Sequence, residues 1–123
     1  MIGHLSFGVT NLQSSMAFYD EVLAELGCVR LWHDATAAGY GPPGGNDRFA
    51  IKLQTSPVVP PGPGFHLAFV AASRDAVDRF YAAALRRGGI DCGAPGPRPH
   101  YSSTYYAAFV LDPDGHRLEA VNQ

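Results

Sequence analysis

An internal repeat constrains this chain more than any other feature of its sequence. Moving the chain along itself by 62 residues superimposes HLSFGV, which starts at His4, on HLAFVA, which starts at His66. The same shift gives seven identities in the 24 positions from His4 to Gly27. The identical pairs are His4 and His66, Leu5 and Leu67, Phe7 and Phe69, Phe18 and Phe80, Tyr19 and Tyr81, Leu23 and Leu85, and Gly27 and Gly89. This repeat predicts two copies of one supersecondary unit.

Each copy is expected to begin with a strand and to continue into a helix. Apolar and other residues alternate in 3–9 and again in 65–71, which is typical of a half-buried strand. Asn11 and Ser73 follow these strands and precede helical apolar spacing, so we expect both to be helix N-caps. Three further strands follow each helix, at about 29–33, 37–41 and 48–54 in the first copy and about 90–93, 105–112 and 116–121 in the second.

These elements predict an α+β fold of two tandem βαβββ modules that form a curved mixed sheet with a concave cleft. The first module occupies about 1–55 and the second about 65–123, and the Pro-rich stretch SPVVPPGPG at 56–64 is the expected linker. Hydrophobic residues make up 46% of the 123 residues, enough for one packed core. We therefore treat 1–123 as a single domain.

Charge and composition exclude several classes of partner. The formal net charge is -2 and no cluster of Lys or Arg is present, so neither nucleic acid nor an anionic membrane surface is expected to bind. The apolar runs are far shorter than the roughly 20 residues that span a bilayer. No basic segment followed by an apolar stretch opens the chain, and Cys28 and Cys92 lie far apart. We expect reduced thiols and a cytoplasmic protein.

The alternation also predicts which side chains share a face. His4 and His66 lie on the side of their strands that faces away from the helix, because Leu5 and Leu67 point toward it. The same parity places Lys52, in FAIKLQ, and Glu119, in HRLEAV, on the face that looks away from the helices. Two such sheets are expected to form a cleft lined by His4, His66, Lys52 and Glu119. Two imidazoles and a carboxylate suit Zn, Ni, Mn or Fe(II), with coordination positions left open for substrate.

Other candidate residues lie near the C-terminal turn. His100 is a candidate general acid or base, since histidine titrates close to neutral pH. Tyr105 is a candidate donor to a substrate oxygen, while alternation requires one of Tyr105 and Tyr106 to pack beneath the helix. His116 follows the DPDG turn, and we expect it to be a surface residue at the hairpin end.

The whole chain resembles the vicinal oxygen chelate superfamily, which includes glyoxalase I, fosfomycin and bleomycin resistance proteins and extradiol dioxygenases. The resemblance rests on the paired modules, the opening HLSFGVTNLQSSMAFYDEVLAELG, the internal HLAF and the closing FVLDPDGHRLEAV. It implies that His4, His66 and Glu119 occupy metal-ligand positions. It also implies a small-molecule substrate and a homodimer.

One departure from the family leaves two functions open. Glyoxalase I-type members carry a fourth ligand, usually Glu, on the strand that here reads FAIKLQ, and Lys52 stands at the expected position. The first function is an enzyme of the glyoxalase or dioxygenase type, whose divalent metal chelates adjacent oxygens of the substrate. The second is a metal-free binding or sequestering protein of the bleomycin-resistance type, in which Lys52 pairs with Glu119 and replaces the metal.

Overall fold

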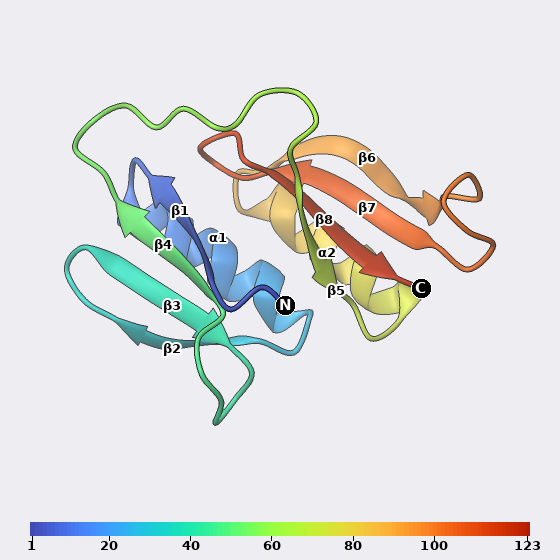
Figure 1. The fold of residues 1–123 in the computed structure, drawn as a ribbon, viewed down its shortest axis with the longest axis horizontal. Helices are drawn as coiled ribbons and strands as arrows, with labels where there is room; N and C mark the ends of the chain where they lie inside the picture. Colours follow the sequence, from blue (N-terminus) through green and yellow to red (C-terminus); the bar gives the residue numbers. More distant parts are fainter.

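The computed structural model describes all residues from 1 to 123 and contains the two predicted modules. Figure 1 shows them side by side, each with one helix behind a sheet. The strands are divided between two four-stranded sheets, one in each module. The predicted α+β arrangement of tandem βαβββ units is confirmed.

The first module forms a mixed sheet with the strand order β1-β4-β3-β2. Strand β1 is parallel to β4, while β3 is antiparallel to both of its neighbours. Its elements are β1 (Leu5–Val9), α1 (Leu12–Ala24), β2 (Val29–His33), β3 (Ala37–Gly41) and β4 (Phe49–Leu53). The predicted N-cap is confirmed, because the Asn11 side chain accepts a hydrogen bond from the Ser14 amide.

The second module repeats this topology as β5-β8-β7-β6. Strand β5 is parallel to β8, and β7 is antiparallel to β8 and β6. Its elements are β5 (Leu67–Val70), α2 (Arg74–Arg86), β6 (Ile90–Pro97), β7 (Tyr106–Leu111) and β8 (Arg117–Asn122). Ser73 caps α2 by accepting from the Ala76 amide, as predicted. Strand β6 extends beyond the predicted 90–93 because its later residues, Gly96 and Pro97, still pair with β7.

The core lies between the helices and the faces of the sheets that they cover. The helices α1 and α2 also pack against each other, which joins the modules into one body. Two ion pairs lie at the edge of this contact. Arg79 of α2 pairs with Glu25 at 2.8 Å, and Arg87, the C-cap of α2, pairs with Glu21 at 2.5 Å. The opposite face of each sheet therefore stays uncovered by a helix (Figure 1). Neither helix is long and apolar enough to cross a membrane.

The turn between β7 and β8 provides a second contact between the modules and corrects one prediction. His116 is buried, not a surface residue, and its ring stacks on Phe7 of β1 with a centroid distance of 4.2 Å. Its Nδ1 lies 2.8 Å from Asp112 Oδ2. The predicted place of His116 at the end of the β7–β8 hairpin is correct. The burial arises because this end of the hairpin packs against the first module.

Candidate functional site

A histidine, a carboxylate and a tyrosine converge on the uncovered face of the second sheet. His66 directly precedes β5, and Glu119 lies in the neighbouring β8, with His66 Nε2 2.9 Å from Glu119 Oε1. Tyr105, just before β7, donates from its hydroxyl to Glu119 Oε2 at 2.5 Å. Oε2 thus accepts a hydrogen bond and Oε1 lies at ion-pair distance from an imidazole, which explains how a carboxylate with 1% of its side-chain surface exposed is tolerated here.

The histidine of this cluster is the accessible member. The His66 side chain is 41% exposed and therefore open to solvent, while its partner Glu119 is buried. Burial raises the pKa of Tyr105 to about 12, and the hydrogen bond to Glu119 adds to the shift. Tyr105 is thus a neutral hydroxyl at physiological pH and remains a donor to Glu119.

His4 occupies the equivalent point of the first module but has a different partner. Its Nε2 lies 2.9 Å from Asp47 Oδ2, in the loop before β4. Hydrogen bonds from His4 and then from Trp32 lower the pKa of the Asp47 carboxyl. Asp47 was not among the residues that the sequence suggested, because it belongs to a loop in which alternation gives no information.

Strand register gives Lys52 a different position from the one expected. Ala68 lies opposite Glu119 in the second module, and Ser6, which the repeat aligns with Ala68, lies opposite Ala50. The position equivalent to Glu119 is therefore Ala50, and Lys52 pairs further along the strand with Gly8. Lys52 forms no ion pair with Glu119, whose two oxygens bind His66 and Tyr105.

The first module fills the space beside Ala50 with an indole. Gly39 of β3 pairs with Ala50, and a Cβ added to Gly39 would lie 2.1 Å from Trp32 Nε1. The Trp32 ring therefore lies directly against the Gly39 backbone on the face that carries His4 and Asp47. A fourth-ligand corner like that of glyoxalase I is absent from this module.

His100 lies at the edge of the cluster rather than within it. Its ring packs against Tyr101 with a centroid distance of 4.2 Å, and Tyr101 packs against Tyr105 at 4.9 Å. Tyr106, the neighbour of Tyr105, instead donates to Asp78 of α2. The aromatic pair at 101 and 105 thus separates His100 from Glu119, and its role as acid or base stays a prediction.

No three His, Cys, Asp or Glu side chains of the chain are arranged to hold a metal ion. Of the three predicted ligands, the structure brings His66 and Glu119 together and leaves His4 with Asp47 on the other sheet. Two donors do not make a metal centre, so the residues of a single chain do not form a site for a divalent metal.

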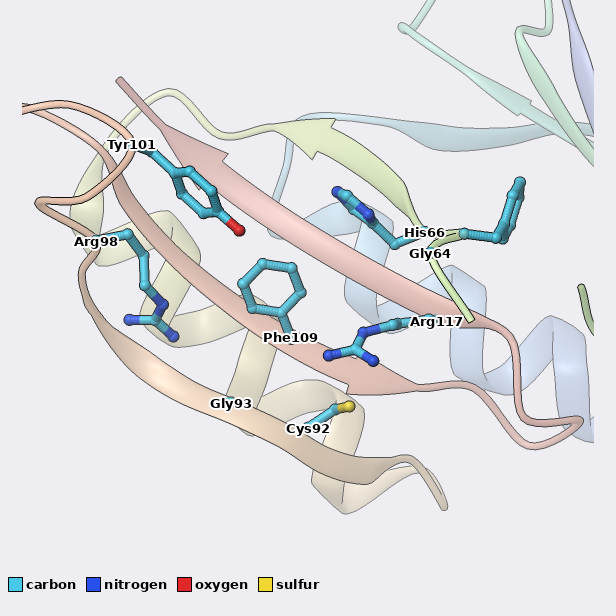
Figure 2. A pocket seen from close by; sticks show the side chains of 9 residues that line it. Gly64, His66, Cys92, Gly93, Arg98, Tyr101, Phe109 and Arg117 are labelled. Atoms are coloured by element: carbon cyan, nitrogen blue, oxygen red, sulfur yellow. The ribbon is translucent and has the colours of Figure 1, made fainter. Parts of the chain in front are cut away.

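A hollow of about 300 Å³ lies beside His66 on the same face. Figure 2 shows Phe109 at its centre, with the guanidinium groups of Arg98 and Arg117 on either side and the Tyr101 hydroxyl directed toward it. Alternation along β8 puts Arg117 on the same face as Glu119. No sequence signal marked Arg98 or Phe109, because one lies in a loop and the other resembles any strand aromatic.

The uncovered face of the second sheet thus combines an accessible histidine with an open hollow. The Glyoxalase/Bleomycin resistance protein/Dioxygenase superfamily model matches residues 1–120, and the chain belongs to this superfamily. No curated protein matches the chain.

Solved structures support the assignment along the whole chain. A glyoxalase/bleomycin resistance protein from Albidiferax ferrireducens T118 is 32% identical, with a TM-score of 0.85 and coverage of 98% of this chain and 97% of that one. A glyoxalase-related enzyme from Fulvimarina pelagi has the same fold at 20% identity, with a TM-score of 0.75 and coverage of 98% and 86%. A glyoxalase I mutant from Zea mays, also 20% identical with a TM-score of 0.67, matches 99% of this chain but only 44% of its own length.

Proposed function

We propose that this chain is a small-molecule enzyme whose reactive centre is His66 on the uncovered face of the second sheet. The observation that carries the proposal is the 2.9 Å contact between His66 Nε2 and the buried carboxylate of Glu119. A carboxylate behind a histidine is the arrangement that orients an imidazole for proton transfer. Membership of the superfamily supports a small molecule as the substrate.

The pairing defines which ring nitrogen meets the substrate. With Glu119 2.9 Å from Nε2, we infer that the Nε2 proton faces the carboxylate, which leaves the lone pair of the neutral imidazole on Nδ1. Nδ1 then takes a proton from a carbon beside a carbonyl group and returns it to a neighbouring atom, which is an isomerisation of the glyoxalase type. Glu119 stabilises the imidazolium that forms, and Tyr105 keeps Glu119 in place through its second oxygen.

A metal-dependent form of this enzyme is the second candidate, and it requires a homodimer. The observation that favours it is that His4 and His66 occupy equivalent points of the repeat, each with Nε2 2.9 Å from a carboxylate oxygen. His4 of a second copy, together with His66 and Glu119, would hold Zn, Ni, Mn or Fe(II). A bound divalent ion would polarise adjacent oxygens of the substrate as a Lewis acid.

Proton exchange tests the principal proposal. The protein is incubated in D2O with a panel of small carbonyl compounds, and loss of the proton beside the carbonyl is followed by NMR. We expect exchange with the wild type, loss of at least 100-fold with His66→Ala, and no change with His33→Ala, an exposed histidine of β2. Exchange that survives in His66→Ala, or is absent for every compound, contradicts the assignment of His66.

Metal content and mass in solution decide between the two forms. Tag-free protein is loaded in turn with each of the four metals and then examined by mass spectrometry for metal and by analytical ultracentrifugation for mass. A stoichiometric metal in a dimer, lost in both His4→Ala and His66→Ala, supports the metal-dependent form. Metal-free protein whose exchange activity resists chelators supports the form that relies on His66 and Glu119 alone.

A further inference from the structure

Two arginines define the hollow beside His66. The Cζ atoms of Arg98 and Arg117 lie 5.7 Å and 5.8 Å from the centre of the Phe109 ring. His66 approaches the same ring, with a centroid distance of 5.8 Å. Figure 2 shows the guanidinium groups on opposite sides of Phe109, with His66 beside them. No Asp or Glu lines the hollow, although the chain as a whole carries a net charge of -2.

The arginines differ in what they already bind. Arg98 donates to the carbonyl oxygens of Gly96 at 2.8 Å and Ala94 at 2.9 Å, so its guanidinium is held in place by the preceding strand, β6. Arg117 forms no ion pair with any carboxylate of the chain, and it is exposed. The nearest carboxylate along β8, that of Glu119, binds His66 and Tyr105 instead. Arg117 therefore presents its hydrogen-bond donors to the hollow.

The floor of the hollow is an aromatic ring. Phe109 lies opposite Glu119 in the pairing of β7 with β8, so its ring is on the uncovered face next to the His66 cluster. Both guanidinium groups lie over this ring, so an apolar surface and two cations border the same space. The volume, about 300 Å³, is at the lower limit of the roughly 300–1,000 Å³ typical of small-molecule pockets.

We propose that this hollow binds the carboxylate of a small planar acid, which Arg117 grips through two hydrogen bonds while the planar body packs against Phe109. The planar fork of arginine matches a carboxylate better than a lysine ammonium does. Arg98 adds a second fixed positive charge, and the Tyr101 hydroxyl borders the same space (Figure 2). The inference deepens the proposed function by naming its substrate class, since an acid held there lies beside His66.

Binding of simple probes tests this proposal without any turnover. Calorimetry in buffer with a chelator compares benzoate with benzamide, which has the same shape without the charge, and with acetate, which has the charge without the ring. We expect benzoate to bind at least ten times more tightly than either. Equal affinities for benzoate and benzamide would overturn the role of the arginines, and equal affinities for benzoate and acetate would overturn the packing against Phe109.

Matched variants then assign the binding to Arg117. Arg117→Gln should reduce the affinity for benzoate at least tenfold, and Arg117→Lys should restore only part of it because a lysine offers no bidentate fork. Arg86→Gln, at the end of α2, should leave it unchanged. Unaltered binding in Arg117→Gln would overturn the proposal. Because benzoate binding is measured without turnover, failure of the proton-transfer function and failure of this site are distinguished.

Discussion

The Tyr19 hydroxyl in helix α1 donates a 2.6 Å hydrogen bond to Asp112 at the start of the turn between β7 and β8. Asp112 also binds His116, through Nδ1 and through the backbone amide. The bond joins the two modules, since Tyr19 belongs to the first and Asp112 to the second. Burial and the nearby carboxylate raise the pKa of Tyr19 well above its usual value, so the hydroxyl stays protonated and keeps donating.

Removal of this hydroxyl should weaken the contact between the modules. Tyr19→Phe leaves the buried carboxylate of Asp112 without one donor, and we expect a loss of about 1–3 kcal/mol in the free energy of unfolding. Urea denaturation followed by circular dichroism measures the loss. The control is Tyr40→Phe, because the Tyr40 hydroxyl donates to Asp20, which is partly exposed. Its loss in the free energy of unfolding should be smaller, about 0.5–1.5 kcal/mol. Equal costs for the two variants would contradict this account.

A methyl group on Gly39 should displace the single tryptophan of the chain. The Cβ of Gly39→Ala would overlap the Trp32 indole, which would have to leave the Gly39 backbone and lose its contact with Asp47. We expect tryptophan emission to shift to longer wavelength and the stability to fall by about 1 kcal/mol. Gly62→Ala is the matched control, because nothing lies within 4 Å of a Cβ added there. Unchanged emission in Gly39→Ala would show that Trp32 lies elsewhere.

The modules could be predicted from the sequence because the repeat and the local signals agree. The N-caps Asn11 and Ser73 are where the pattern predicted them, and β1 and β5 have the expected faces. Alternation specifies only the face of a residue, whereas Lys52 needed its position along the neighbouring strand. That position depends on register, and β1 pairs with β4 so that Ala50 takes the place expected for Lys52.

The candidate site could be predicted only in part for a related reason. His66 and Glu119 are neighbours because they lie on paired strands of one module, which the repeat identifies. Whether His4 joins them depends on how two sheets face each other, and no local pattern encodes that. His116 was misplaced for the same reason: its burial comes from contact with Phe7 in the other module, 109 positions earlier in the sequence.

The contribution of Tyr105 to stability should depend on pH. Its pKa is about 12 in the folded protein and near its ordinary value of 10.0 after unfolding. Because the folded state holds the proton more tightly, the contribution is complete below pH 10 and is lost as the pH rises through 10 toward 12. The difference in unfolding free energy between wild type and Tyr105→Phe should therefore be constant near neutral pH and shrink above pH 10. A difference that stays constant to pH 12 would contradict the Tyr105–Glu119 bond as its source.

The tautomer of His66 follows from its contact with Glu119 and can be observed directly. With Nε2 2.9 Å from the carboxylate, the neutral ring should carry its proton on Nε2 and leave Nδ1 without one. Long-range nitrogen–proton NMR spectra separate the two tautomers, and His66→Ala identifies the signal among the five histidines. Glu119→Gln keeps the shape of the side chain but removes its charge, so the preference for the Nε2 proton should weaken. A wild-type ring protonated on Nδ1 would instead present Nε2 as the base, and the substrate would have to approach from the side that Glu119 occupies.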